Sequence, residues 1–251
     1  MFDFIYSNMP IFLCVFCRVA GFVVSAPVLR AKGVPKKVRV FFIFVISLLV
    51  FLTFELRGVE LEAPALSMVL NFICGAIVGM LVMVAFEMFS IGGHFIAMGS
   101  GLGFSVLADP TSNGQATSLA NFYKISASLI FVSSGGILAL FIILKQSFDV
   151  FDLNLTELPN LTQEYVLAVF KYSLTGALLL SAPMLFTTLL VNIAFGVISK
   201  SSPSMNIFSV GLPVTILVTI LFMTMTIDSL PILVLKFMND VPGLIWGDLG
   251  V

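Results

Sequence analysis

The sequence predicts an all-α protein of the polytopic membrane type, with broken helices and a central glycine-rich re-entrant or plug loop. Of its 251 residues, 59% are hydrophobic and only 10% are charged, and the mean hydropathy is +1.15. Soluble domains carry about 25% charged residues. No hydrophilic block is long enough to fold separately, so residues 1–251 are expected to form a single domain. The formal net charge of −1 excludes an electrostatic nucleic-acid binder.

Apolar runs of about 20 residues can cross a bilayer as helices, and this chain repeats such runs between short polar connections. The expected segments are 4–29, 38–54, 65–89, 119–144, 166–198 and 205–235. The second is short, and the last two contain prolines. The first segment lacks a basic start and a small-residue cleavage site, so it is expected to stay as a membrane segment rather than to be removed as a signal peptide.

The charges of the connections predict the orientation of the chain. The connection between the first two segments is basic and contains Lys36, Lys37 and Arg39, whereas the next connection is mainly acidic. The positive-inside rule therefore places the basic connection in the cytoplasm and both termini outside. The basic connection either contacts a cytoplasmic partner or anchors the chain to anionic lipid headgroups.

A few charged side chains fall inside the apolar segments, where each costs at least about 2.5 kcal/mol on insertion scales. These residues are Arg18, Glu87, Lys124, Lys171 and Asp228. They form either a proton or ion relay or polar contacts that hold helices together. Lys124 and Lys171 lie near segment ends and can reach the interface. Arg18 is expected to pair with a carboxylate, and Glu87 is the first candidate within the chain.

A glycine-rich stretch from Gly92 to Phe104 interrupts the apolar pattern. Each helical glycine costs about 1 kcal/mol relative to alanine, so the stretch predicts an irregular loop. Such backbone persists at membrane depth only where protein buries it or where it lines a cavity. A flexible loop that carries Leu102 and Phe104 suits a dry constriction that gates by dewetting. The alternative is a re-entrant loop that only packs.

Asp109-Pro110 ends this stretch, because the residue before a proline is disfavoured in helices. Asp109 either binds an ion or, as we favour, makes a local turn or cap. Thr117 or Ser118 is expected to cap the helix that begins near Leu119. Further upstream, Gly75 and Gly79 have the spacing at which membrane helices approach closely, and we expect them to serve assembly with other subunits.

The reactive side chains do not form a catalytic or metal-binding pattern. The chain has three cysteines and one histidine. Cys14 and Cys17 form a C-x-x-C pair without a second ligand pair, which favours two small buried residues over a metal or redox site. His94 has no neighbouring ligand cluster or triad in the sequence. The prediction is a protein that is not an enzyme and uses no cofactor and no metal.

Three separated blocks of this sequence resemble the blocks of a single family. They contain Arg18-Val19-Ala20-Gly21 with Val34-Pro35-Lys36-Lys37-Val38-Arg39, then Gly101-Leu102, Phe104 and Asp109-Pro110, then Asn192-Ile193-Ala194-Phe195-Gly196 with Gly211-Leu212-Pro213. In this order and spacing they are similar to the FliR family of flagellar type III export-gate proteins, over about residues 10–220.

The resemblance implies a core subunit of a flagellar protein export gate in the bacterial inner membrane, at the basal body. Such a subunit assembles with FliP-like and FliQ-like subunits and meets FlhB-like and FlhA-like export proteins and membrane lipid. Unfolded flagellar proteins pass through the conduit, and no nucleic acid is involved. The family's pore plug loop corresponds here to Gly99, Gly101, Leu102, Gly103, Phe104, Asp109 and Pro110.

Two alternatives remain at the level of sequence. Virulence type III secretion systems contain related export-apparatus subunits, although Gly211-Leu212-Pro213 looks more flagellar. A small-solute secondary transporter would also use broken helices and isolated charges, but no internal repeat supports it. This chain also differs from the family, because His94 stands where an acidic residue is usual. In the assembled complex of this family, many of the helices lie at the level of the periplasm. Six hydrophobic segments therefore need not mean six helices that finally span the membrane.

Overall fold

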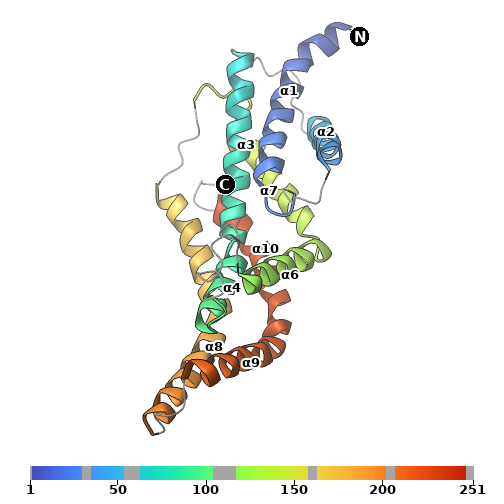
Figure 1. Ribbon diagram of the computed structural model, residues 1–251. Coiled ribbons are helices and arrows are strands. Elements are labelled where there is room, and N and C mark those ends of the chain that lie inside the picture. The colour runs from blue at the N-terminus through green and yellow to red at the C-terminus, as the bar shows by residue number, and fades with distance from the viewer. Residues whose placement is uncertain are drawn as a thin grey trace. The chain divides into compact units, whose positions relative to one another are not determined.

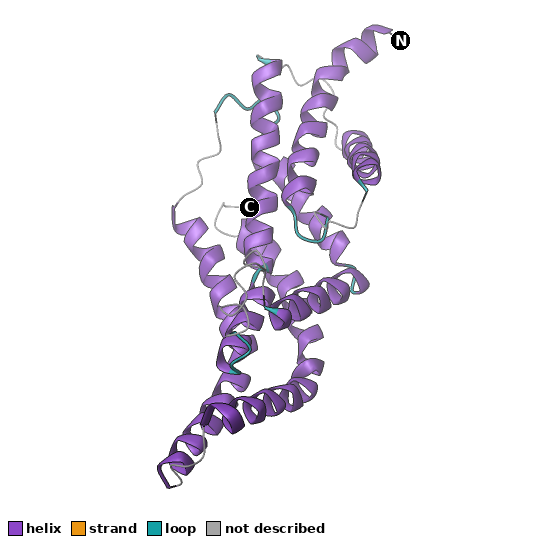
Figure 2. Cartoon of the chain, in the orientation of Figure 1, coloured by secondary structure: helices purple, strands orange, loops and turns teal. Residues whose placement is uncertain are grey.

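The computed structural model describes residues 2–29, 35–53, 63–103, 117–157, 163–201 and 207–246. Within these ranges the chain is helical and contains no strand, which confirms the all-α prediction (Figures 1 and 2). The elements are α1 Phe2–Ser25, α2 Lys36–Thr53, α3 Pro64–Phe86, α4 Met88–Gly99, α6 Ser118–Ser133, α7 Gly136–Val150, α8 Gln163–Ser201, α9 Ile207–Thr226, the short 3-10 helix η1 Ile227–Ser229 and α10 Leu230–Trp246.

The helices form two compact units that are each assembled from separate stretches of the chain. Unit 1 contains residues 1–86, 135–170 and 238–251, and unit 2 contains residues 87–134 and 171–237. Unit 1 is therefore built mainly from α1, α2, α3 and α7. Unit 2 is built from α4, α6, α9 and most of α8. The long helices α8 and α10 each run from one unit into the other.

Three helical stretches of the described residues are long and apolar enough to cross a membrane. They are Pro64–Gly99, Val166–Lys200 and Val210–Trp246, and the bent pair α6 and α7 makes a fourth if it counts as one span. Two of the expected segments are not among these stretches. In α1 the apolar stretch whose side chains the structure describes, Met9–Ser25, is shorter than the length required, and α2 begins with three cations within its first four residues. The chain is thus a polytopic helical membrane protein.

The predicted broken helices are confirmed at two places. Gly135 adopts φ 82°, and this left-handed residue divides the expected segment 119–144 into α6 and α7. The expected segment 205–235 is divided by η1, after which α10 continues to Trp246. In contrast, the irregular backbone expected from Gly92 onward is wrong, because helix α4 continues to Gly99.

Glycines bring α1 and α3 of unit 1 into backbone contact. A Cβ atom on Gly75 would lie 2.0 Å from the backbone oxygen of Arg18, and one on Gly79 would lie 2.7 Å from that of Phe22. Gly21 faces the oxygen of Phe72 in the same way, at 2.1 Å. Any side chain here would separate the helices. Gly75 and Gly79 therefore lie in a contact within this chain, and we expect their substitution to act first on its own fold rather than on assembly.

The side chain of Arg18 is 0% exposed and makes four hydrogen bonds within unit 1. Its Nε donates to Asn71 Oδ1 at 2.8 Å. One terminal nitrogen donates to the carbonyl oxygens of Ser147 and Phe151, both at 2.8 Å, and the other donates to that of Asp152 at 2.7 Å. The guanidinium carbon also lies 4.6 Å from the ring centre of Phe148.

These contacts make Arg18 the cap of the C-terminus of α7. The last carbonyl groups of a helix have no partner within the helix and carry its negative dipole end, so a cation there satisfies both. Asn71 completes the cap by donating to the oxygens of Ser67 at 2.7 Å and Leu153 at 2.9 Å. The expected pairing of Arg18 with Glu87 is wrong, because Glu87 instead forms an ion pair with Lys124.

We predict that Arg18→Ala destabilises the purified chain by about 3 kcal/mol or more, because buried oxygen acceptors lose a charged donor. Arg18→Lys should recover only part of this loss, since one ammonium cannot reach both Asn71 and the end of α7. The measurement is unfolding in mild detergent, with the exposed Lys171→Ala as control. An alanine variant as stable as the control would contradict the capping role.

We also predict that Gly75→Ala lowers stability by about 1–3 kcal/mol, as overpacking does. The matched control is Gly196→Ala on α8, where a Cβ atom would meet nothing within 4 Å. That change should be neutral or stabilising by about 0.5–1 kcal/mol, because alanine loses less backbone entropy on folding than glycine does. Equal shifts in melting temperature for the two variants would show that the close contact between α1 and α3 does not determine stability at Gly75.

Candidate functional site

The candidate site is the helical hairpin of α4 and α6 in unit 2, together with the turn that follows α4. The two helices touch through Gly93, where a Cβ atom would lie 2.6 Å from Ala120 Cα and 2.9 Å from the oxygen of Leu119. The hydroxyl of Thr117 accepts the Ala120 N–H at 3.3 Å and caps α6. Thr117 is one of the two caps predicted from the sequence, and the structure confirms it.

Helix α8 covers α4 through the other glycines of the stretch. A Cβ atom on Gly92 would lie 2.7 Å from Leu180 Cδ2, and one on Gly99 would lie 2.8 Å from Leu185 Cδ2. Where Gly176 of α8 meets α4, a Cβ atom would lie 2.5 Å from the sulfur of Met88. This packing explains why the glycine-rich stretch stays helical: the cost of each glycine, about 1 kcal/mol, is offset by close contact between helices.

Aromatic packing closes the same unit from α10. The ring of Phe237 lies 6.1 Å, between centroids, from that of Phe89 on α4 and 6.1 Å from that of Phe131 on α6. Both pairs are edge-on, the arrangement that aromatic rings favour. All three side chains are buried. The hairpin is therefore held on several sides, and α4 is a rigid element rather than a flexible loop.

The irregular backbone begins only after Gly99. Ser100 ends α4, and Gly101 follows with φ 82°, a left-handed conformation that glycine adopts without strain. The N–H groups of Gly101 and Gly103 donate back to the oxygens of Met98 and Ala97. Of the predicted plug residues, Gly99 lies in the helix and Gly101, Leu102 and Gly103 form this turn. Phe104, Asp109 and Pro110 lie outside the described residues.

Charged groups join the two helices of the hairpin. Lys124 of α6 donates to Glu87 at the start of α4, and their side chains are 41% and 29% exposed. At the other end of the contact, the hydroxyl of Thr117 lies 3.5 Å from His94 Nδ1. Glu87 and Lys124, two of the charged residues within the apolar segments, thus bind each other across the hairpin. This arrangement favours helix packing over a proton or ion relay.

The basic connection leads into the first turn of α2. The oxygen of Pro35 accepts the N–H groups of Val38 and Arg39 at 3.0 and 3.2 Å, so the helix begins directly after the proline, close to the predicted start. Lys36 and Lys37 are exposed. They lie beside a shallow apolar hollow formed by α1 and α2. The surface therefore combines cations with apolar side chains. Both predicted roles, contact with a cytoplasmic partner and anchoring to anionic lipid headgroups, require this combination.

The described residues contain no group of three or more His, Cys, Asp or Glu side chains that could hold a metal ion. Cys14, Cys17 and Cys74 are free thiols. What unit 2 offers instead is tight helix packing with a glycine turn at one end.

Sequence reasoning missed Asn71 as the partner of Arg18. A polar amide inside an apolar helix was the available signal, because such groups need a partner in a membrane.

We predict that Glu87 and Lys124 are coupled by about 0.5–1 kcal/mol, the range for partly exposed ion pairs. Single Glu87→Gln and Lys124→Gln variants should each lose about as much stability as the double variant. Exchanging the charges, Glu87→Lys with Lys124→Glu, should recover most of the loss. A double-mutant cycle on detergent-purified protein measures this, and strictly additive losses with no recovery would contradict it.

Comparison with known proteins agrees with the resemblance. The sequence model of the family "Bacterial export proteins, family 1" matches residues 9–241. The flagellar biosynthetic protein FliR of Bacillus subtilis (strain 168) is 26% identical over 226 residues, which cover 87% of this chain and 86% of the relative. FliR of Escherichia coli (strain K12) is 25% identical over 214 residues, which cover 82% of this chain and 80% of the relative.

A relative from another system is similar to the same extent. The surface presentation of antigens protein SpaR of Shigella flexneri is 24% identical over 208 residues, which cover 82% of this chain and 80% of the relative. These matches extend over both structural units and confirm the resemblance to the FliR family. Because the family model covers nearly the whole chain, the protein belongs to family 1 of the bacterial export proteins.

Proposed function

We propose that this chain is a core subunit of the flagellar type III export gate, embedded in the bacterial inner membrane at the flagellar basal body. The observation that carries the proposal is the family match over residues 9–241, together with relatives named flagellar biosynthetic protein FliR. Membership of an export apparatus implies other export components around the chain. In the proposed assembly these are FliP-like and FliQ-like subunits, with FlhB-like and FlhA-like proteins at the cytoplasmic side.

The surface of unit 2 supports such an assembly. Long helices present large apolar side chains outward, including Val197 at 64%, Leu217 at 65% and Met225 at 68% exposed. In a membrane these faces contact lipid or other membrane helices. Within α9, the hydroxyls of Thr215 and Thr219 already donate to backbone oxygens of the same helix at 2.8 Å. This surface is suited to packing against further helices, and that role needs no catalytic residue.

The glycine turn supports a role in closing the conduit. Gly99, the last residue of α4, packs against Leu185 and Thr188 of α8, and Gly101 then redirects the chain. We propose that the residues from Gly99 to Pro110 narrow the passage for unfolded flagellar proteins in the resting state. Apolar side chains on glycine-rich backbone exclude water when packed together and part without breaking strong bonds. The packing-only role is the competing explanation.

The match to SpaR favours a second candidate, an export-apparatus subunit of a virulence secretion system. Deleting the gene in its own organism separates the two. The flagellar proposal expects cells without external flagellar structures and with normal secretion of other proteins. An affinity-tagged chain should also be recovered from the membrane in a large complex with other small hydrophobic proteins. Normal flagella in the deletion strain, or a tagged chain recovered alone, would overturn the proposal.

We predict that converting Leu102 and Phe104 to glycine raises the permeability of the membrane to small ions, because the apolar seal is lost. The control is Leu102→Met with Phe104→Leu, which keeps apolar bulk and should leave permeability unchanged. Conductance or ion uptake is measured in cells whose assembled complex is verified by co-purification. If the glycine variant assembles and its permeability equals that of the wild type, the loop only packs.

A further inference from the structure

Helix α1 of unit 1 ends in a turn whose backbone is strained. Val28 has φ 65°, and the N–H of Leu29 donates to the oxygen of Pro27 at 2.7 Å. A three-residue turn closed in this way, with positive φ at its centre, is the rare and strained form of the γ-turn. Among the described residues, Val28 alone combines a side chain with positive φ. A β-branched side chain fits this conformation poorly, so the turn carries a conformational cost.

The proline in the turn does not by itself explain why α1 ends there. Elsewhere in the described chain, prolines lie inside helices, namely Pro10, Pro183, Pro213 and Pro242. The nearest comparison is on α8, where the run Ser-Ala-Pro-Met-Leu at residues 181–185 stays helical. Residues 25–29 read Ser-Ala-Pro-Val-Leu. The same local pattern is thus helical in α8 and bent at the end of α1.

A continuous helix through these residues would place Val28 on the exposed side of α1. Residues four apart share a face of a helix, so Val28 would lie one turn beyond Val24. Val24 is 46% exposed, which leaves this face open within unit 1. A proline inside a helix and a valine at positive φ carry penalties of the same order. The bent and the continuous forms of residues 25–29 are therefore close in free energy.

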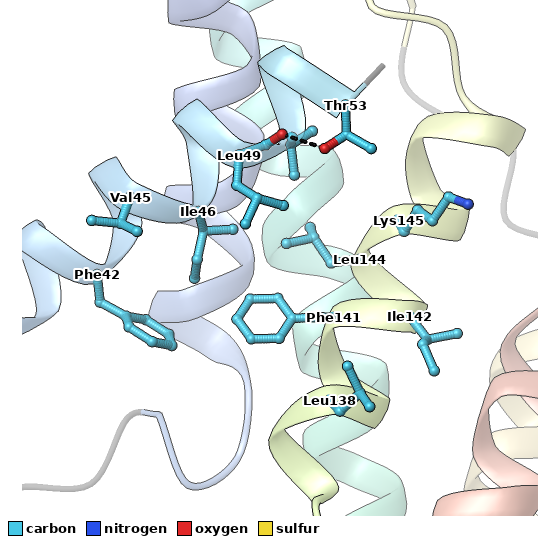
Figure 3. A pocket seen from close by; sticks show the side chains of 11 residues that line it. Phe42, Val45, Ile46, Leu49, Thr53, Leu138, Phe141, Ile142, Leu144 and Lys145 are labelled. Atoms are coloured by element: carbon cyan, nitrogen blue, oxygen red, sulfur yellow. Dashed lines mark hydrogen bonds between the residues drawn. The ribbon is translucent and has the colours of Figure 1, made fainter.

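The packing of α2, which follows the basic connection, leaves room for both forms. Figure 3 shows an open apolar groove between α2 and α7, with Phe42 and Leu49 on one side and Phe141 on the other, and its volume is about 440 Å³. Against α1 the packing is closer, because the ring of Phe44 lies edge-on to that of Phe12 at 6.1 Å. Since α7 holds α2 only loosely, α2 is free to adjust its position together with the end of α1.

We propose that residues 25–29 are a two-state joint between α1 and the basic connection. In the state that the structure shows, α1 ends at Ser25. In the second state α1 continues through residues 26–29 by about one turn, which relieves the strain at Val28 and shortens the connection to α2. The joint makes the position of the basic connection adjustable while α1 stays packed on α3. It goes beyond the proposed function and does not depend on it.

The direction of α1 relative to α3 determines what the second state changes. The two helices run in parallel, because Gly75 faces Arg18 and Gly79 faces Phe22 one turn further along both. Continuation of α1 therefore carries residue 29 away from Leu66 near the start of α3, at about 1.5 Å per residue. The separation of these two positions reports the state of the joint.

The test measures this separation with spin labels on Leu29→Cys and Leu66→Cys, in the full chain and in the complex in which it is extracted. Leu66 is an exposed residue. The native thiols, Cys14, Cys17 and Cys74, are replaced by alanine. Singly labelled samples identify any distances between copies of the chain. Pulsed electron–electron double resonance should show a main shorter distance and a minor longer one when the joint has its native sequence.

Two substitutions should shift the ratio of the longer to the shorter distance in opposite directions. Val28→Gly removes the strain of the bent form and should lower the ratio about fivefold or more. Pro27→Ala restores the N–H that a continuous helix uses and should raise the ratio about tenfold or more. The matched control is Val69→Gly, the same change at an exposed position of α3, which should leave the ratio unchanged.

A single distance in the chain with the native joint would overturn the proposal. So would a ratio in Val28→Gly equal to that in Val69→Gly, or a Pro27→Ala variant in which the longer distance does not increase. None of these outcomes depends on which export system the complex serves, so failure of the joint leaves the proposed function untouched.

Discussion

The buried guanidinium of Arg18 is the contact on which the arrangement of unit 1 depends. It lies on α1, and its four hydrogen bonds reach Asn71 on α3 and three backbone oxygens at the end of α7. These partners are 53 to 134 residues away in the sequence. A charge without partners at this depth would be costly, so the helices must meet where all four acceptors surround it. One side chain thereby defines where α7 ends against α1 and α3.

Close backbone contact at glycines is the second constraint, and both units use it. In unit 1 the glycines of α1 and α3 face backbone oxygens of the other helix, and in unit 2 Gly92, Gly93 and Gly99 let α8 and α6 approach α4. Water-driven burial does not hold helices together within a bilayer. Van der Waals contact must take its place, and it is largest where backbones can approach without intervening side chains.

These constraints bear on the proposed gate. A conduit for unfolded polypeptides needs a frame that stays closed to ions and a segment that can move. In the proposed gate the frame would be the packed part of α4, α6 and α8, where glycines serve contact and not flexibility. Freedom of the backbone starts later, at Gly101 with φ 82°. A seal that began at Gly92 would have had no rigid support next to it.

Local sequence patterns predicted several features correctly. Hydropathy indicated a polytopic helical protein, Pro35 marked the beginning of α2, and Thr117 was one of the two residues expected to cap α6. Hydropathy runs located α1, α2, α3 and α8 to within a few residues, because the energy of placing a side chain in an apolar environment depends mainly on that side chain. The helices α7 and α10 continue beyond the expected segments, and α4 was expected to be irregular. The positions at which these runs are interrupted were harder to predict from the sequence. The break at Gly135 depends on a backbone angle that many glycines do not adopt.

Only the tertiary structure decided what the unusual residues do. A glycine costs a helix the same amount wherever it stands, so the sequence could not distinguish Gly92 and Gly93, which are helical contact points, from Gly101, which turns the chain. In the same way, the sequence by itself determined that Arg18 needs a buried partner. It did not determine that this partner is Asn71 with the end of α7 instead of Glu87. The need for a partner belongs to one side chain, whereas the choice of partner depends on which distant helices pack together.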